Sequence, residues 1–157
     1  MRFIIMLILT ALQMSLTAQT GMFGDKAKVY LVRHGEKDTG DDPRLTRNGN
    51  ARAGELVRIL REKNIRRIYV TEYRRTQETG DSLRIQMQID TIHYLADTLC
   101  QDLLAKIKQN NDLNKPILII GHSNTIPLII RKLGLGNYPA NNIPDDELIT
   151  CSVNVHE

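Results

Sequence analysis

The stretch Lys28-Val-Tyr-Leu-Val-Arg-His-Gly-Glu36 decides how this chain is organised. Its first five residues form a short apolar run that predicts a buried strand over 28–32. The change to Arg33 and His34 marks the end of that strand. In open α/β sheets, ligands gather beyond the carboxyl ends of the strands. An arginine and a histidine at this point therefore indicate an anion site with an imidazole beside it.

The same pattern occurs again later in the chain. Residues 117–120 read Ile-Leu-Ile-Ile, which predicts a second buried strand, and His122 follows after one glycine. A helix predicted over 126–133 begins just beyond, so its unpaired N–H groups favour an anion beside the histidine. Ser123 and Asn124 are expected to cap this helix, and donation to the anion is the alternative.

A third strand is predicted over 65–70, followed by a helix over 74–85 that begins with two arginines. Neighbouring helix positions point apart, so only one of Arg74 and Arg75 is expected to reach the anion site. A parallel sheet brings the three strand ends to one edge. The side chains that would converge there are those of His34, His122, Arg33 and Arg75.

Strand-like runs and amphipathic helical stretches alternate along the rest of the chain. Helices are predicted over 46–63, with Thr46 as N-cap, and over 98–109; strands are predicted over 89–95 and 148–155. This alternation predicts a three-layer α/β/α sandwich with a mostly parallel central sheet. The length of 157 residues suits one domain, predicted over 25–157.

The amino-terminal segment has a different character. A basic start at Arg2 precedes the nearly unbroken apolar run 3–12, and polar residues follow. This layout predicts a signal peptide over 1–18, cleaved after Ala18, because the apolar run is too short to span a bilayer comfortably. The alternative is an uncleaved anchor. We expect export to the periplasm or the exterior, with no stable membrane insertion after the leader is removed.

Composition narrows the classes of partner. The formal net charge is only +3 and aromatic residues make up 4%, so the chain offers neither a basic stripe nor a base-stacking platform for nucleic acid. Cys100 and Cys151 stand in no metal-ligand spacing, and no metal site is predicted. Their pairing in an oxidising compartment stays open, because separation in sequence does not report separation in space.

Two histidines and two arginines suit a phosphoryl group better than a metal ion. Guanidinium groups repel a cation, but their planar fork binds phosphate oxygens in pairs. A neutral imidazole attacks phosphorus, and fixed positive charge stabilises the equatorial oxygens in the transition state.

Four segments resemble motifs of the histidine phosphatase superfamily, also called the phosphoglycerate mutase-like superfamily. They are Leu31-Val-Arg-His-Gly-Glu-Lys37, Leu45-Thr-Arg-Asn-Gly49, Arg75-Thr-Gln-Glu-Thr79 and Ile120-Gly-His-Ser-Asn124. The resemblance implies the phosphoglycerate mutase-like fold and a nucleophile, His34, that becomes phosphohistidine. It also implies a phosphate pocket completed by Arg33, Arg75 and His122. The residues by themselves do not say which histidine attacks.

The proton donor for the leaving group is open. In the acid phosphatase and phytase branch an Asp follows the second histidine, whereas this chain has Ser123. Asp97 and Glu36 are the candidates here, and a raised pKa would be needed for either to donate near neutral pH. Asp97 as a solvated helix N-cap is the alternative.

The expected function is that of a secreted, metal-independent phosphatase without a cofactor. It would hydrolyse a phosphomonoester or related phosphoryl group, on a small molecule or a phosphoprotein, through a phosphohistidine on His34. Two alternatives remain: a non-catalytic phospho-ligand-binding protein that uses the same pocket, and a protein-phosphohistidine phosphatase. The sequence does not specify the physiological substrate.

Overall fold

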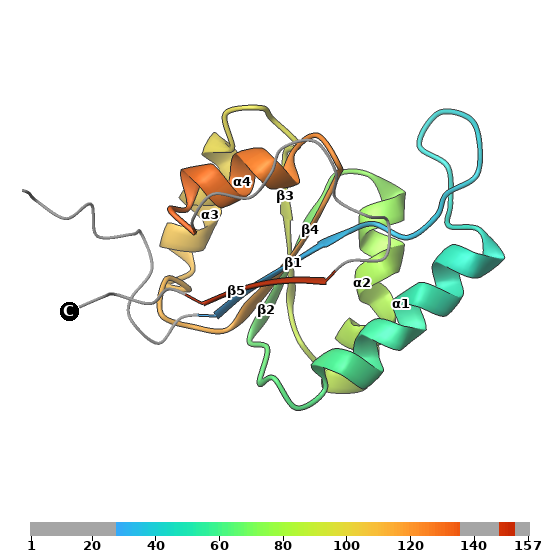
Figure 1. Ribbon diagram of the computed structural model, residues 1–157, viewed down its shortest axis with the longest axis horizontal. Helices are drawn as coiled ribbons and strands as arrows, with labels where there is room; N and C mark the ends of the chain where they lie inside the picture. Colours follow the sequence, from blue (N-terminus) through green and yellow to red (C-terminus); the bar gives the residue numbers. More distant parts are fainter. Residues whose placement is uncertain (1–27, 136–147, 153–157) are drawn as a thin grey trace, which may run out of the picture.

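The computed structural model describes residues 28–135 and the backbone of 148–152. These residues form a five-stranded sheet with helices on both faces (Figure 1). In chain order the elements are β1 (Lys28–Arg33), α1 (Arg47–Leu60), β2 (Arg67–Thr71), α2 (Arg74–Met87), β3 (Thr91–Tyr94), α3 (Gln101–Gln109), β4 (Ile117–Gly121), α4 (Ile126–Lys132) and β5 (Leu148–Ser152).

The strand order across the sheet is β3-β2-β4-β1-β5. The first four strands are mutually parallel, and β5 runs antiparallel along β1 at the edge. Helices α1 and α2 lie on one face, and α3 and α4 lie on the other (Figure 1). The predicted three-layer architecture with a mostly parallel sheet is therefore confirmed.

Each face of the sheet has its own hydrophobic core, because successive strand residues point to opposite faces. In β1, Val29 and Leu31 join the core under α3 and α4, whereas Tyr30 and Val32 join the core under α1 and α2. Every residue of β4 is buried, as its unbroken apolar sequence predicts for a strand covered on both sides.

All the predicted elements occur, but several ends differ. The helix predicted over 46–63 begins after its expected N-cap, Thr46, whose hydroxyl accepts the N–H of Gly49, and ends at Leu60. The helix predicted from 98 begins only at Gln101, because Cys100 adopts a left-handed φ of 56°. The predicted leader and residues 153–155 of the last predicted strand lie outside the described residues.

The amino ends of the strands, opposite the predicted site, are joined by a buried polar cluster. Asp112 is fully buried and accepts hydrogen bonds from the Tyr69 hydroxyl at 2.8 Å and from Lys115 Nζ at 2.8 Å. Arg67 Nε donates to the same carboxylate at 3.3 Å. These bonds hold the pKa of Asp112 low despite its burial, so the group is a structural anion.

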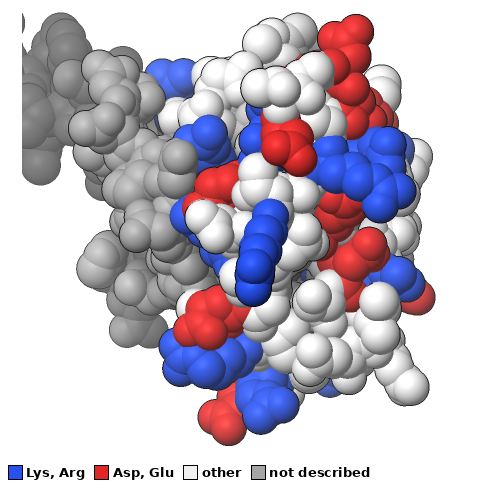
Figure 2. Space-filling view, turned by 90° about the vertical axis from the view of Figure 1, so that its right-hand side faces the viewer, with Lys and Arg blue, Asp and Glu red and all other residues white. Residues whose placement is uncertain are grey.

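The outer surface of α1 and α2 carries basic and acidic side chains intermixed (Figure 2). No helix in the described part of the chain is long and apolar enough to cross a membrane.

Candidate active site

The sheet register brings the two histidines together. Arg33, the last residue of β1, pairs with Gly121, the last residue of β4, so the next residue of each strand emerges at the same edge. The N–H of His34 continues the ladder by donating to the Gly121 carbonyl at 3.1 Å. The ring centroids of His34 and His122 are 5.3 Å apart, and the two residues are 6% and 7% exposed.

The His34 ring is held in one protonation state. Its Nδ1 lies 2.7 Å from the Gly35 carbonyl, which only accepts, so Nδ1 carries the proton and Nε2 carries a lone pair. Burial lowers the pKa of His34 from 6.5 to about 4, and the charges of Arg75, Arg33 and Lys37 act in the same direction. At neutral pH the ring is therefore uncharged, with a lone pair on Nε2.

A close backbone contact holds the segment after His34 against α1. A Cβ on Gly35 would lie 2.8 Å from the Gly49 carbonyl oxygen, and one on Gly49 would lie 2.2 Å from the Glu36 carbonyl oxygen. The Gly35 N–H donates to Thr79 Oγ1 at 2.9 Å, and that hydroxyl donates to the Arg75 carbonyl at 2.6 Å. These contacts join three of the four motif segments.

Arg75 lies in the first turn of α2 with its guanidinium at the site. Its Cζ is 4.2 Å from the ring centroid of Tyr73, and its Nη1 is 3.8 Å from Asp42 Oδ1. The side chain is 15% exposed, and its buried Nε has no hydrogen-bond partner among the described residues. The neighbouring Arg74 is exposed, and its backbone N–H donates to Asp42. Of the two arginines, Arg75 is the one at the site.

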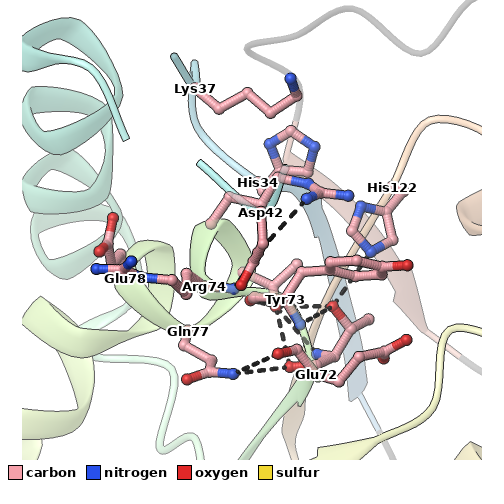
Figure 3. A network of polar contacts seen from close by, with 12 residues as sticks. His34, Lys37, Asp42, Glu72, Tyr73, Arg74, Gln77, Glu78 and His122 are labelled. Carbon is pink, nitrogen blue, oxygen red and sulfur yellow. Dashed lines mark hydrogen bonds and ion pairs between the residues drawn. The ribbon is translucent and has the colours of Figure 1, made fainter. Parts of the chain in front are cut away.

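His122 is enclosed by Tyr73 and by the end of β2 (Figure 3). The Tyr73 ring meets the imidazole edge-on, with centroids 5.4 Å apart, and Thr71 Oγ1 lies 3.1 Å from His122 Nε2. Burial lowers the pKa of His122 to about 4, with Arg75, His34 and Arg33 adding to the effect.

The sequence patterns did not predict three residues that lie at the site: Asp42, Tyr73 and Thr71. The signal for Thr71 was its place directly after the strand predicted over 65–70, where the sheet register sets it level with Gly121, one residue before His122. Asp42 was part of a turn, Gly40-Asp-Asp-Pro43, and nothing in that composition indicates that the loop folds onto α2.

The two proton-donor candidates have other partners. The Asp97 carboxylate accepts the N–H groups of Gln101 at 3.2 Å and Asp102 at 3.4 Å, which is the capping geometry proposed as its alternative role. Glu36 forms an ion pair with Arg52 of α1. Proton donation by Asp97 stays a prediction.

The expected capping of α4 by Ser123 and Asn124 is wrong. Both residues are exposed, and Thr125 is the N-cap residue. The Thr125 hydroxyl instead accepts the N–H of His122 at 3.0 Å, which stabilises the tight turn between β4 and α4.

A cavity of about 200 Å³ opens at the site and is lined by Arg33, His34, Gly35, Glu36 and Lys37. Within residues 28–135 and 148–152, no three His, Cys, Asp or Glu side chains gather as a metal site would require. Cys100 is buried and forms no disulfide with a described side chain; the side chain of Cys151, its possible partner, lies outside the described residues. An uncharged imidazole flanked by guanidinium groups can bind a tetrahedral oxyanion and attack its central atom.

Comparison with known proteins agrees with this geometry. The family model for the histidine phosphatase superfamily (branch 1) matches residues 29–98. No curated protein matches the chain.

Three solved structures illustrate the similarity of fold. A protein named phosphohistidine phosphatase SixA, from Agrobacterium tumefaciens, has a TM-score of 0.55 and 18% identity, over 66% of this chain and 74% of that one. A phosphoserine phosphatase mutant from Entamoeba histolytica, in complex with phosphoserine, has a TM-score of 0.52 and 20% identity, over 71% and 87%. The alpha-ribazole phosphatase from Shigella flexneri has a TM-score of 0.53 and 17% identity, over 72% and 81%.

Proposed function

We propose that this chain is a member of the histidine phosphatase superfamily, whose family model matches residues 29–98, and that it hydrolyses a phosphomonoester or related phosphoryl group through a phosphohistidine on His34. The phosphoryl group is carried by a small molecule or a phosphoprotein. The solved relatives include proteins named for phosphohistidine, phosphoserine and ribazole phosphate, so the superfamily accommodates several leaving groups on one fold.

The reaction takes place in two steps. In the first, Nε2 of His34 forms a bond to phosphorus, the bond from phosphorus to the leaving oxygen breaks, and the electron pair departs with that oxygen. Arg33 and Arg75 balance the charge on the equatorial oxygens. In the second, water attacks phosphorus, the N–P bond breaks, and inorganic phosphate and His34 are released.

The observation that carries this proposal is the hydrogen bond from His34 Nδ1 to the Gly35 carbonyl at 2.7 Å. It leaves the lone pair on Nε2, beside a second buried imidazole and the Arg75 guanidinium. A protein that only binds phosphorylated ligands needs the arginines, but it gains nothing from a buried histidine held with an unprotonated nitrogen.

Turnover of p-nitrophenyl phosphate tests the proposal. We expect His34→Ala to abolish phosphate release while the fold persists by circular dichroism. We expect His93→Ala, which removes an exposed histidine of β3, to retain it. No release by the wild type across a broad panel of phosphorylated substrates would favour the non-catalytic binder.

Inhibitors test whether the reaction needs a metal ion. We expect vanadate to inhibit turnover and metal chelators to leave it unchanged. Loss of activity in a chelator, restored by zinc, would contradict metal independence.

Mapping the covalent intermediate identifies the nucleophile. Brief reaction with a 32P-labelled substrate, quenched without acid because phosphohistidine is acid-labile, should label His34. Label on His122 would reverse the two roles.

Export is the remaining part of the proposal, and it is supported by the order of charge and hydrophobicity over residues 1–18. Amino-terminal sequencing of the protein from the periplasm and the medium should find a mature chain that begins after Ala18. Recovery of the intact amino terminus in the membrane fraction would favour the uncleaved anchor instead.

A further inference from the structure

A buried chain of hydroxyl groups connects His122 to the backbone at the start of α2. His122 Nε2 lies 3.1 Å from Thr71 Oγ1, which lies 2.9 Å from Thr76 Oγ1. Thr76 Oγ1 in turn lies 2.8 Å from the Tyr73 carbonyl oxygen. Both threonines are fully buried, so no water competes for these contacts. Figure 3 shows the contact from the His122 ring toward the end of β2.

The direction of each hydrogen bond follows from counting protons. A carbonyl oxygen only accepts, and the Tyr73 carbonyl is the nearest acceptor to Thr76 Oγ1, at 2.8 Å against 2.9 Å for Thr71 Oγ1 and 3.3 Å for the Thr71 carbonyl. We therefore assign the single hydroxyl proton of Thr76 to Tyr73. Thr71 must then donate to Thr76, because Thr76 has no proton left for that contact. The remaining contact needs a proton from the imidazole. All three contacts are hydrogen bonds only if Nε2 of His122 carries hydrogen and donates to Thr71.

From this chain we infer that Thr71 and Thr76 are positioning residues that hold His122 in its Nε2–H tautomer and leave a lone pair on Nδ1. Nδ1 of His122 lies on the side of the ring that faces His34 (Figure 3). The pocket therefore presents two unprotonated nitrogens, Nε2 of His34 and Nδ1 of His122. Since a nitrogen without hydrogen cannot donate to a phosphoryl oxygen, His122 acts in the pocket as a proton acceptor.

The proton that it accepts, on the basis of the proposed function, comes from the hydrolytic water. The water oxygen forms a bond to phosphorus, and the N–P bond breaks with its electron pair returning to Nε2 of His34. One proton of the water moves to Nδ1 of His122, and inorganic phosphate leaves. The low pKa of His122 keeps the ring uncharged before this step, and the phosphoryl anion beside it raises its basicity when the intermediate forms.

Long-range 1H–15N NMR of uniformly labelled protein reads the tautomer directly and needs no turnover. We expect the wild-type His122 ring to show hydrogen on Nε2 and a pyridine-like Nδ1. Thr71→Val should shift the ring toward a mixture of both tautomers, whereas Thr71→Ser should restore the wild-type spectrum. Hydrogen on Nδ1 in the wild type, or an unchanged tautomer in Thr71→Val, would overturn the inference.

Two further variants complete the NMR experiment. Thr76→Val interrupts the chain one link away from the ring and should also produce a mixture; an unchanged tautomer there would remove Thr76 from the chain. Thr91→Val is the matched control, because this β3 threonine has a buried hydroxyl without a hydrogen-bond partner in the described structure. It should leave the His122 signals unchanged, and a shift in them would mean that the method reports general strain.

Single-turnover kinetics separate the two chemical steps. In Thr71→Val, phosphorylation of His34 should change by less than about twofold, and its hydrolysis should slow roughly 10- to 100-fold, so phosphohistidine accumulates. Equal slowing of both steps would overturn the role in hydrolysis. A wild-type protein without any turnover would refute the proposed function, while the NMR result would still decide the tautomer.

Discussion

At the scale of single residues, burial decides the chemistry of His34 and His122. A solvated histidine is partly protonated near pH 6.5, and a protonated ring has no lone pair for attack. Enclosure beside the guanidinium groups lowers the pKa of both rings to about 4, so both stay uncharged under neutral conditions. In the proposed reaction, the arginines that bind the phosphoryl anion thus also help to keep the His34 ring uncharged.

The lowered pKa values of His34 and His122 predict that the free energy of unfolding depends on pH. The folded protein binds fewer protons than the unfolded chain between pH 4 and 6.5, so the free energy of unfolding should fall as the pH falls through that window. NMR titration should find both imidazoles uncharged at pH 6, and urea unfolding should show lower stability at pH 5 than at pH 7. A midpoint near 6.5 for either ring would contradict the prediction.

Tyr73 supports the anion site by contact with Arg75 and His122. Tyr73→Leu removes the aromatic face under the guanidinium, and the loss of that contact should weaken inhibition by inorganic phosphate about 2- to 5-fold. Tyr73→Phe keeps the aromatic face and should bind phosphate as the wild type does. Equal inhibition constants for the Leu variant and the wild type would show that the ring does not position Arg75.

At the scale of elements, the site depends on how closely α1 approaches the segment after β1. The two glycines, Gly35 and Gly49, allow close backbone contact between this segment and α1, and Thr79 of α2 accepts the N–H of Gly35. The segment that carries His34 is therefore held from two sides. Glycine is required here because any side chain would separate the backbones, not because of a special φ.

A pair of substitutions in α1 tests this contact. Gly49→Ala places a methyl group 2.2 Å from the Glu36 carbonyl oxygen, so it should destabilise the fold by about 1–3 kcal/mol and lower activity by moving His34. Gly54→Ala, in the same helix, adds a methyl group with no atom of the described residues within 4 Å and should stabilise the fold by about 0.5–1 kcal/mol. Chemical denaturation measures both; equal stability of the two variants would refute the close contact.

At the scale of the whole molecule, the candidate site and the buried polar cluster around Asp112 lie at opposite edges of the sheet. The carboxyl ends of β1, β2 and β4 carry the site, and the amino ends are joined by the cluster around Asp112. A parallel sheet separates these roles, because it places all strand ends of one kind at one edge.

Substitution of Asp112 should therefore affect stability alone. Asp112→Ala leaves the Tyr69 hydroxyl and the Arg67 guanidinium without a buried acceptor, which should cost about 3 kcal/mol in the free energy of unfolding. At a temperature where the variant is folded, kcat and KM for p-nitrophenyl phosphate should equal those of the wild type. A large change in KM with unchanged stability would contradict the separation of roles.

The order and type of the elements could be predicted from local patterns. Buried parallel strands are short and continuously apolar, as in Ile117–Gly121, and helices show apolar positions at helical spacing, as in Arg47–Leu60. The ends of the elements were less predictable. Helix α3 begins late because Cys100 has a left-handed backbone conformation, and a cysteine side chain does not indicate that conformation in the sequence.

The sequence by itself determined which residues lie at the strand ends, because a polar residue that interrupts an apolar run can be recognised from the order of the residues alone. Arg33, His34 and His122 were identified in that way, and Arg75 by its place at the start of the helix that follows the strand predicted over 65–70. Only the tertiary structure decided their protonation, and only it brought Asp42, Tyr73 and Thr71 to them. The physical reason is that burial and charge pairing depend on groups that packing brings within a few ångströms, and many of these groups, such as Thr71 beside His122, are distant along the chain.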